Sequence, residues 1–266
     1  MQIITLTTDW GLRDHYAGSV KGAILSRYAE AKIVDITHCV AVFDILQASF
    51  IIRNCFRDFP KGSIHIISVN SQLEMDLNHL VMEYDGHYFI GPDVGVFSMI
   101  CDNEPARFVK IAIGPDISDA HLNFPTRYLF VNAACHLAQG GELEDLGDLT
   151  TAVVEKHMLR PTVEGTTIRG SIQYVDIYGN VITNISKNLF EDVFQGRPFI
   201  IYLRKNDYDI DQISEFYNDV PHGEKLALFN SAGYLEIAIN TGSATGLLNL
   251  KVNDGIKIVF DDYQNR

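Results

Sequence analysis

The sequence is poor in cysteine and in basic residues. Its four cysteines form no CxxC pair, so neither a zinc site nor a disulfide framework is indicated, and we expect reduced, mostly buried thiols. Lys and Arg number 21 against 34 Asp and Glu, a formal charge of −13 that predicts no nucleic-acid partner, because phosphate binding needs clustered cations. No apolar run is long enough to span a bilayer and the start carries no basic leader, so we expect no membrane partner and a cytoplasmic location.

Several common site signatures are also missing. The sequence contains no GxGxxG, no GxxxxGK[ST] and no GxSxG, which removes the usual signals of dinucleotide, nucleoside-triphosphate and α/β-hydrolase sites. The nine histidines show no HxxxH spacing and no neighbouring cysteine cluster. We therefore predict no metal site.

What is present is a chain of 266 residues, 47% hydrophobic, which can bury a sizeable core. In its first part, β-branched runs alternate with helical patterns, which predicts an α/β fold with a largely parallel sheet. The expected elements are Ile3 to Thr8, Tyr16 to Arg27, Ile33 to Ile36, Ile45 to Arg53, Ile64 to Val69, a hairpin of Leu80 to Tyr84 and Tyr88 to Ile90 around Asp85-Gly86, a strand from Phe108 to Ile113, and a helix from Arg127 to Ala138.

The pattern changes around residues 160 to 170, where Pro161, Gly165 and Gly170 mark a boundary. Short strands follow closely after it, which favours a smaller β-barrel or sandwich. The expected strands are Thr167 to Val175, Val181 to Asn184, Phe199 to Leu203, Lys225 to Phe229, Tyr234 to Ile239 and Gly255 to Phe260. We therefore predict an α/β domain over residues 1–163 and a β-barrel-like domain over residues 167–266.

Two acids follow the first expected strand, Asp9 directly and Asp14 shortly after it. Ligands of α/β proteins bind at the carboxyl ends of parallel strands, so this is where a substrate would lie. Carboxylates repel anions and accept hydrogen bonds from hydroxyl and ammonium groups, which suits a polyol or an amine better than a phosphate. The alternative is that both acids merely cap the following helix.

Five blocks along the chain form a recognisable set. They are Thr8-Asp9-Trp10-Gly11, Val34-Asp35-Ile36-Thr37-His38, Gly91-Pro92-Asp93-Val94-Gly95, Val175-Asp176-Ile177-Tyr178-Gly179-Asn180 and Asn230-Ser231-Ala232-Gly233-Tyr234-Leu235. In this order and spacing the chain resembles the S-adenosylmethionine hydroxide adenosyltransferases, relatives of the bacterial fluorinase and chlorinase. The resemblance implies an amino-terminal α/β domain, a carboxyl-terminal β-barrel-like domain, and a homotrimer with inter-subunit sites for a small-molecule adenosyl ligand.

The resemblance also implies roles for single residues and no cofactor besides S-adenosylmethionine as substrate. Asp9 matches the carboxylate that binds both ribose hydroxyls, and Asn180 an amide that reads the adenine edge. The other implied substrate-binding residues are Asp14, Asp176 and Ser231 near the methionine, Phe43 beside the ribose, Phe124 in the block around residue 125, and Tyr178 and Phe216 on the adenine faces. The implied reaction is in-line attack at the ribose 5′ carbon, which releases neutral methionine and needs no general acid.

The sequence departs from the family where the hydroxide-forming members carry an Asp-Arg-His trio. Those places hold Asn70, Leu77 and Pro125, none of which can share a proton with water. Thr126 matches a halide-side hydroxyl of the fluorinase, whereas Leu73 replaces the other one. Thr126 and Asn70 are thus the catalytic candidates. The substitute bases to consider are His65, His79 and His121.

Three functions remain open at this point. The first is an enzyme that splits S-adenosylmethionine to adenosine and methionine with water or hydroxide. The second is a non-catalytic protein that binds an adenosyl ligand as a sensor, and the third is adenosyl transfer to a halide. The binding residues suit all three, whereas loss of the trio weakens the first.

Overall fold

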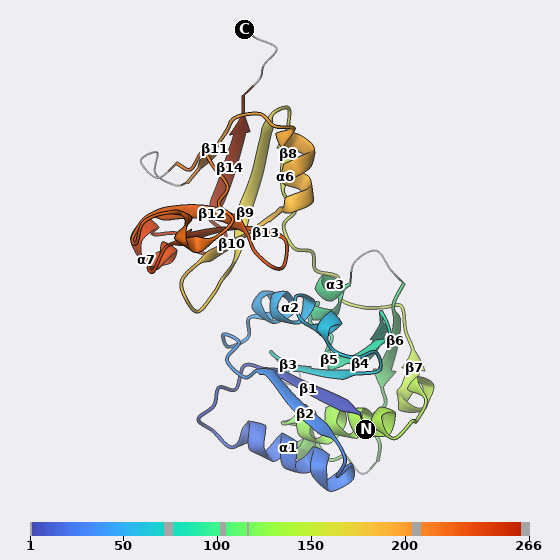
Figure 1. Ribbon diagram of the computed structural model, residues 1–266. Coiled ribbons are helices and arrows are strands. Elements are labelled where there is room, and N and C mark those ends of the chain that lie inside the picture. Colours follow the sequence, from blue (N-terminus) through green and yellow to red (C-terminus); the bar gives the residue numbers. More distant parts are fainter. Residues whose placement is uncertain (1, 72–76, 102–104, 116, 204–208, 262–266) are drawn as a thin grey trace. The chain divides into compact units, whose positions relative to one another are not determined.

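The computed structural model describes residues 2–71, 77–101, 105–115, 117–203 and 209–261, which form two compact units, an N-terminal unit (Met1–Met158) and a C-terminal unit (Leu159–Arg266). The prediction of an α/β fold followed by a smaller β-barrel-like part is confirmed (Figure 1). The expected strands agree with those observed to within about two residues at each end. None of the described helices combines the length and apolar character that crossing a bilayer requires.

The N-terminal unit is built on a mixed sheet with strand order β2-β1-β3-β5-β4-β6-β7. Its strands are β1 (Ile3–Thr8), β2 (Lys32–Thr37), β3 (Ile64–Ser68), β4 (His79–Tyr84), β5 (His87–Pro92), β6 (Arg107–Ile111) and β7 (Gly147–Leu149). The pairs β2–β1, β1–β3 and β3–β5 are parallel, whereas the pairs β5–β4, β4–β6 and β6–β7 are antiparallel. Asp85 and Gly86 both have positive φ, 47° and 68°, as a two-residue hairpin turn requires.

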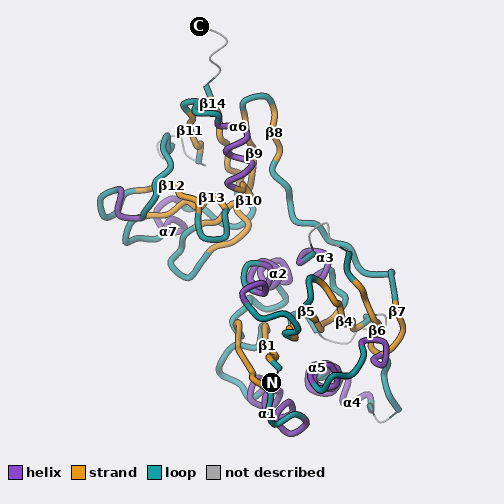
Figure 2. The backbone as a smooth tube through the Cα atoms, turned by 45° about the vertical axis from the view of Figure 1, so that its right-hand side comes forward, coloured by secondary structure: helices purple, strands orange, loops and turns teal. Residues whose placement is uncertain are grey.

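Helices cover both faces of this sheet (Figure 2). They are α1 (Tyr16–Arg27), α2 (Ile45–Arg53), α3 (Val96–Ile100), α4 (Asp119–Leu122) and α5 (Val131–Ala138), with short turns at Phe56–Asp58 and Leu143–Leu146 and a π-helical turn at Thr126–Phe130. One core holds Ile24 of α1, Ile66 of β3 and Ala134 of α5, whereas Phe56, Phe89 and Phe97 lie in a second core. The parallel strands β1, β3 and β5 are largely buried, whereas β2 lies at the sheet edge and is partly exposed.

The C-terminal unit is a curled antiparallel sheet with strand order β11-β14-β9-β10-β13-β12, and β8 pairs with β9. The strands are β8 (Thr162–Glu164), β9 (Thr167–Val175), β10 (Val181–Ser186), β11 (Phe199–Tyr202), β12 (Lys225–Phe229), β13 (Tyr234–Ile239) and β14 (Gly255–Phe260). The helical elements are α6 (Lys187–Phe194), a short turn at Tyr217–Asp219 and α7 (Ala244–Leu248). The first half of β9 pairs with β14 and its second half with β10, so this strand carries the curl.

The four cysteines are free thiols, as predicted, but the expectation that they are mostly buried is wrong. Cys135 alone is buried, Cys55 and Cys101 are half-buried, and Cys39 is exposed. Cys39 is exposed because it follows β2 in the loop at the sheet edge rather than lying within the strand.

Candidate functional site

The carboxyl edge of the parallel strands brings several predicted residues together. Asp9 follows β1 and Asn70 follows β3, and Thr8 and Ser68 are register partners, so the two strands end side by side. Asp9 is half-buried, whereas Asn70 is exposed with a positive φ of 52°. The edge that the sequence identified as a ligand site therefore presents a carboxylate and an amide at neighbouring strand ends.

Asp9 also contacts a residue far away in the sequence. Its Oδ2 accepts a hydrogen bond of 2.9 Å from the backbone N–H of Phe43, which has a left-handed φ of 67° and an exposed ring. Oδ1 of Asp9 makes no hydrogen bond to another described residue. The carboxylate thus keeps one oxygen for a ligand while it holds the loop between β2 and α2.

The alternative that these acids merely cap the next helix is wrong. Helix α1 has His15 as its N-cap residue, and no side chain caps it by a hydrogen bond. Asp14 is exposed, at the start of this helix. Beside Asp9, the ring of Trp10 lies 5.3 Å from that of Phe124 in an edge-on contact, which places Phe124 next to the strand end.

Thr126 belongs to a buried chain of hydroxyl groups. Its Oγ1 lies 2.5 Å from Oγ of Ser68, and that oxygen lies 2.9 Å from Oγ of Ser71. Thr126 and Ser68 are fully buried, whereas Ser71 is half-buried. The two serines flank Asn70 and were missed by sequence reasoning, although their place at a strand end was a usable signal. Leu73 lies outside the described residues.

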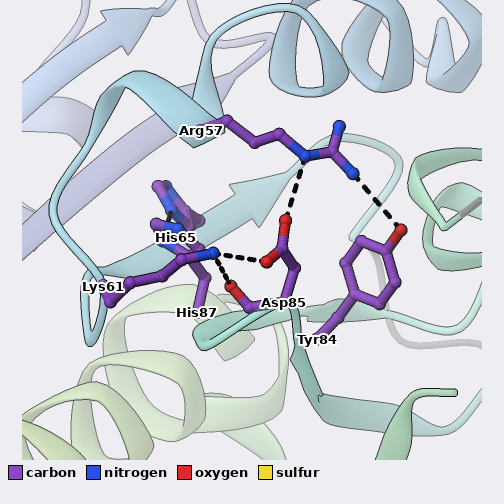
Figure 3. Close-up of polar contacts among 6 residues, drawn as sticks. All are labelled: Arg57, Lys61, His65, Tyr84, Asp85 and His87. Atoms are coloured by element: carbon purple, nitrogen blue, oxygen red, sulfur yellow. Dashed lines mark hydrogen bonds and ion pairs between the residues drawn. The ribbon is translucent and has the colours of Figure 1, made fainter. Parts of the chain in front are cut away.

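The substitute bases are poorly suited to take a proton from water. His65 is the second residue of β3, at the end of the sheet opposite Asp9, where it lies against His87 beside the Lys61, Asp85 and Arg57 side chains (Figure 3). Burial, and then the neighbouring His87, lowers the pKa of His65 to about 3.

The other two histidines are also engaged in packing. Burial lowers the pKa of His79 to about 4, and its ring packs against Phe130. His121 stacks on Tyr128 with ring centroids 4.1 Å apart. Across the described ranges, no group of three or more His, Cys, Asp or Glu side chains could hold a metal ion.

In the C-terminal unit, Asp176 organises the loop between β9 and β10. Its Oδ1 accepts the backbone N–H groups of Tyr178 and Asn180 at 2.9 and 2.8 Å, and its Oδ2 accepts the Asn180 side chain at 3.1 Å. These bonds leave Ile177 and Tyr178 exposed at the loop tip, whereas Asn180 is buried. The block from Val175 to Asn180 is therefore a turn that the Asp176 side chain stabilises and that exposes the Tyr178 ring.

This loop forms one wall of a pocket of about 610 Å³. The lining residues are Tyr178, Asn180, Tyr217, Ile239, Thr241 and Gly242. Aromatic rings and a buried amide suit a flat heterocycle that offers hydrogen-bonding edges. Of the predicted residues, Tyr178 and Asn180 line this pocket, and Tyr217 lines it without having been singled out from the sequence. Phe216 and Ser231 are exposed and do not line this pocket.

A larger pocket of about 880 Å³ lies between α6 and residues 211–215 and contains none of the predicted site residues. Among its charged side chains, Lys187 pairs with Glu191 and Arg197 donates to the Val193 carbonyl. Because the smaller pocket holds Tyr178 and Asn180, it is the better candidate for a ligand site.

Comparison with known proteins agrees with this geometry. Residues 4–147 match the SAM hydroxide adenosyltransferase N-terminal domain, and residues 170–257 match the C-terminal domain of the same family. An (R)-S-adenosyl-L-methionine hydrolase of Methanocaldococcus jannaschii is 28% identical, over 98% of this chain and 97% of that protein. A fluorinase of an Actinoplanes species is 22% identical, over 94% of each chain.

A solved structure has a similar fold over nearly the whole length. The crystal structure of an uncharacterized conserved protein from Thermotoga maritima superposes with a TM-score of 0.86 at 31% identity, over 97% of this chain and 100% of that one. Both units therefore have counterparts in one relative. With both of its domain profiles matched, the chain belongs to the SAM hydroxide adenosyltransferase family.

Proposed function

We propose that this protein splits S-adenosylmethionine at the ribose 5′ carbon into adenosine and methionine, with water or hydroxide as the nucleophile. The observation that carries the proposal is the pocket in which Tyr178 and the buried amide of Asn180 lie side by side on the Asp176 turn. Relatives named as S-adenosylmethionine hydrolases match over nearly the full length of the chain, which supports the same reaction here.

The proposed roles follow the chemistry of each side chain. Asp9 uses its open oxygen for the ribose hydroxyls, Asn180 reads the adenine edge and Tyr178 covers one adenine face. Phe216, which does not line the pocket in the single chain, is assigned to the other adenine face on the family resemblance. We assign Asp14, Asp176 and Ser231 to the methionine ammonium. Phe43 and Phe124 are assigned to the surroundings of the ribose. Each of the two units contributes residues to this set.

The reaction needs little acid–base help at the leaving group. A sulfonium sulfur takes the electron pair of the broken C5′–S bond and departs as neutral methionine, while water forms the new C5′–O bond and releases one proton to solvent. Alignment and desolvation of the water therefore dominate catalysis. We assign Thr126 and Asn70 to the side of the nucleophile, and the proposal requires no cofactor and no metal.

A second candidate function is binding without turnover. It is favoured by Asn70, Leu77 and Pro125, which replace the family's proton-sharing trio with groups that cannot titrate. In that case the protein would hold an adenosyl ligand as a sensor. Adenosyl transfer to a halide is the third candidate function, because Thr126 matches one of the two hydroxyl groups on the halide side of the fluorinase site.

We also propose a homotrimer in the cytoplasm. Large apolar side chains lie exposed next to the candidate residues of both units, with exposed fractions of 66% for Val42, 54% for Phe43, 93% for Ile177 and 63% for Phe216. Exposed apolar patches of this kind mark contact surfaces. Free thiols at all four cysteines suit a reducing compartment. Light scattering after size-exclusion chromatography tests the trimer, and a monomer would refute it.

The decisive experiment follows product formation by mass spectrometry in water enriched in heavy oxygen, with and without chloride. We expect adenosine that carries the heavy oxygen, together with methionine. Asp9→Ala should abolish the formation of labelled adenosine. The matched control Asp58→Ala, which changes an exposed acid of the same unit, should leave this product unchanged. A ligand-induced thermal shift without product supports the sensor, and 5′-chloroadenosine supports halide transfer. Unchanged binding and turnover in Asp9→Ala would refute the ribose assignment.

A further inference from the structure

Glu236 is a buried carboxyl group for which the proposed reaction has no role. It lies on β13, opposite Ile182 of β10, and is 3% exposed. A buried carboxylate is costly unless its oxygens are hydrogen-bonded. Within the described residues its two bonds come from neutral donors, Tyr217 Oη at 2.7 Å and Asn230 Nδ2 at 3.2 Å. Apolar side chains would fill this place at lower cost, which points to a functional reason for the acid.

The first donor belongs to the pocket wall. Tyr217 lines the pocket together with Tyr178 and Asn180. Its backbone is fixed locally, because Oδ2 of Asp219 accepts the N–H groups of Glu215 and Phe216 at 2.8 and 2.9 Å. The bond to Glu236 then fixes the far end of the Tyr217 ring. Backbone and hydroxyl together hold the ring in one orientation against the pocket.

The second donor belongs to the turn that carries Ser231. Oδ1 of Asn230 accepts the backbone N–H groups of Ala232 and Tyr234, both at 3.1 Å. Its Nδ2 donates to Glu236, so the turn between β12 and β13 is tied to the same carboxylate. Glu236 therefore joins two segments that are adjacent to candidate ligand groups.

The electrostatics agree with this arrangement. Burial raises the pKa of the Glu236 carboxyl, the hydrogen bonds from Tyr217 and Asn230 oppose that rise, and the nearby charge of Asp176 adds to it. Burial, and then the bond to Glu236, raises the pKa of the Tyr217 phenol. The phenol thus stays protonated near neutral pH and donates a hydrogen bond to the carboxyl group.

We propose that Glu236 is a positioning residue of the adenosyl pocket, which orients the Tyr217 ring and thereby sets the affinity for the nucleoside, while its second bond holds the turn that carries Ser231. This inference rests on the proposed function, because it takes the pocket as the nucleoside site. It adds two residues, Glu236 and Tyr217, that the sequence did not single out.

The test measures adenosine binding to the full-length protein by calorimetry. Tyr217→Phe removes the donor, and Glu236→Gln keeps the shape but not the charge of the acceptor. Tyr217→Phe should raise the Kd about tenfold, the scale of a lost hydrogen bond to a charged group. Glu236→Gln should raise the Kd about threefold, because its amide oxygen still accepts the Tyr217 hydroxyl but without the charge. The double variant should bind no worse than Tyr217→Phe, since both changes act on the same bond. In turnover, KM should rise in parallel while kcat stays within about twofold, because the same contact is lost in ground and transition states.

Glu224→Gln is the matched control, because this glutamate is exposed just before β12 in the same unit. It should bind adenosine as the wild type does, and thermal unfolding checks that every variant is folded. If Glu236→Gln does not fold, Tyr217→Phe carries the test alone. Wild-type affinity in Tyr217→Phe, or fully additive losses in the double variant, would overturn the inference. A wild-type protein that binds neither adenosine nor S-adenosylmethionine would instead overturn the proposed function, and with it the pocket assignment.

Discussion

Acidification should destabilise the N-terminal unit through His65. This side chain is fully buried, and its pKa is lowered from 6.5 to about 3, first by burial and then by His87. The unfolded chain takes up a proton as the pH falls below about 6.5, whereas the folded chain does not until about pH 3. The stabilisation by neutral His65 is therefore complete above pH 6.5 and is lost progressively between these two values.

The size of the effect follows from the distance between the pH and the unfolded pKa. At pH 5 that distance is about 1.5 units, and at about 1.36 kcal/mol per unit the loss is about 2 kcal/mol. Asp93 and Glu236 act in the opposite direction, because burial raises the pKa of both carboxyl groups. These contributions are the same in the wild type and in His65→Gln. The difference in unfolding free energy between the two proteins therefore reports the protonation of His65 alone.

Trp10 is the single tryptophan of the chain and lies in the same unit, so its fluorescence reports the relevant unfolding in urea. The gap in unfolding free energy between wild type and His65→Gln should narrow by about 2 kcal/mol from pH 7 to pH 5. His157→Gln is the control, because its side chain is 78% exposed in the same unit and should leave the pH dependence unchanged. An equal gap at both pH values would refute the reasoning.

Three further changes test other parts of the fold. Asp176→Ala removes the acceptor of two backbone N–H groups and should destabilise the C-terminal unit by about 2 kcal/mol. Thermal unfolding followed by circular dichroism measures this loss, and an unchanged melting temperature would contradict a stabilising role of these hydrogen bonds. Thr126→Val removes one of the two partners of the buried Ser68 hydroxyl, which keeps Ser71 at 2.9 Å, and should cost about 0.5–1.5 kcal/mol in urea unfolding followed by Trp10; a neutral result would contradict this contact. Gly91→Ala places a Cβ 2.7 Å from the Ile67 carbonyl and should cost about 1–3 kcal/mol in the same assay, whereas Gly114→Ala, with open space around it, should not; equal effects would rule out the close approach.

The sequence predicted those parts of the fold that local patterns determine. The Asp85-Gly86 pair identified the hairpin because both residues must adopt positive φ there. Asp9 was placed correctly at a strand end because a buried β-branched run must stop where polar groups begin. The loop at Asp176 lies between two strands that the sequence predicted, and its hydrogen bonds explain why an acid and an amide stand four residues apart.

Long-range contacts were not predictable in the same way. Nothing local indicates that Phe43 adopts a left-handed φ, since glycine or asparagine would be expected there. The π-helical turn at Thr126–Phe130 lies within a sequence that reads as continuous helix. Tyr217 and Glu236 meet because the segment around Ser214 pairs with Ala227 of β12, the strand next to β13, and no spacing in the sequence encodes that contact.

The bond between Asp9 and the Phe43 backbone has an evolutionary consequence. The same carboxylate holds a strained aromatic residue and, in the proposed reaction, binds the nucleoside sugar, so a mutation at position 9 would be penalised twice, once in folding and once in recognition. Selection for a well-formed loop would then preserve this acid even in a descendant that had ceased to turn over its ligand. An aspartate at this place in a relative would therefore be a poor marker of activity, and the residues at positions 70, 77 and 125 would be a better one.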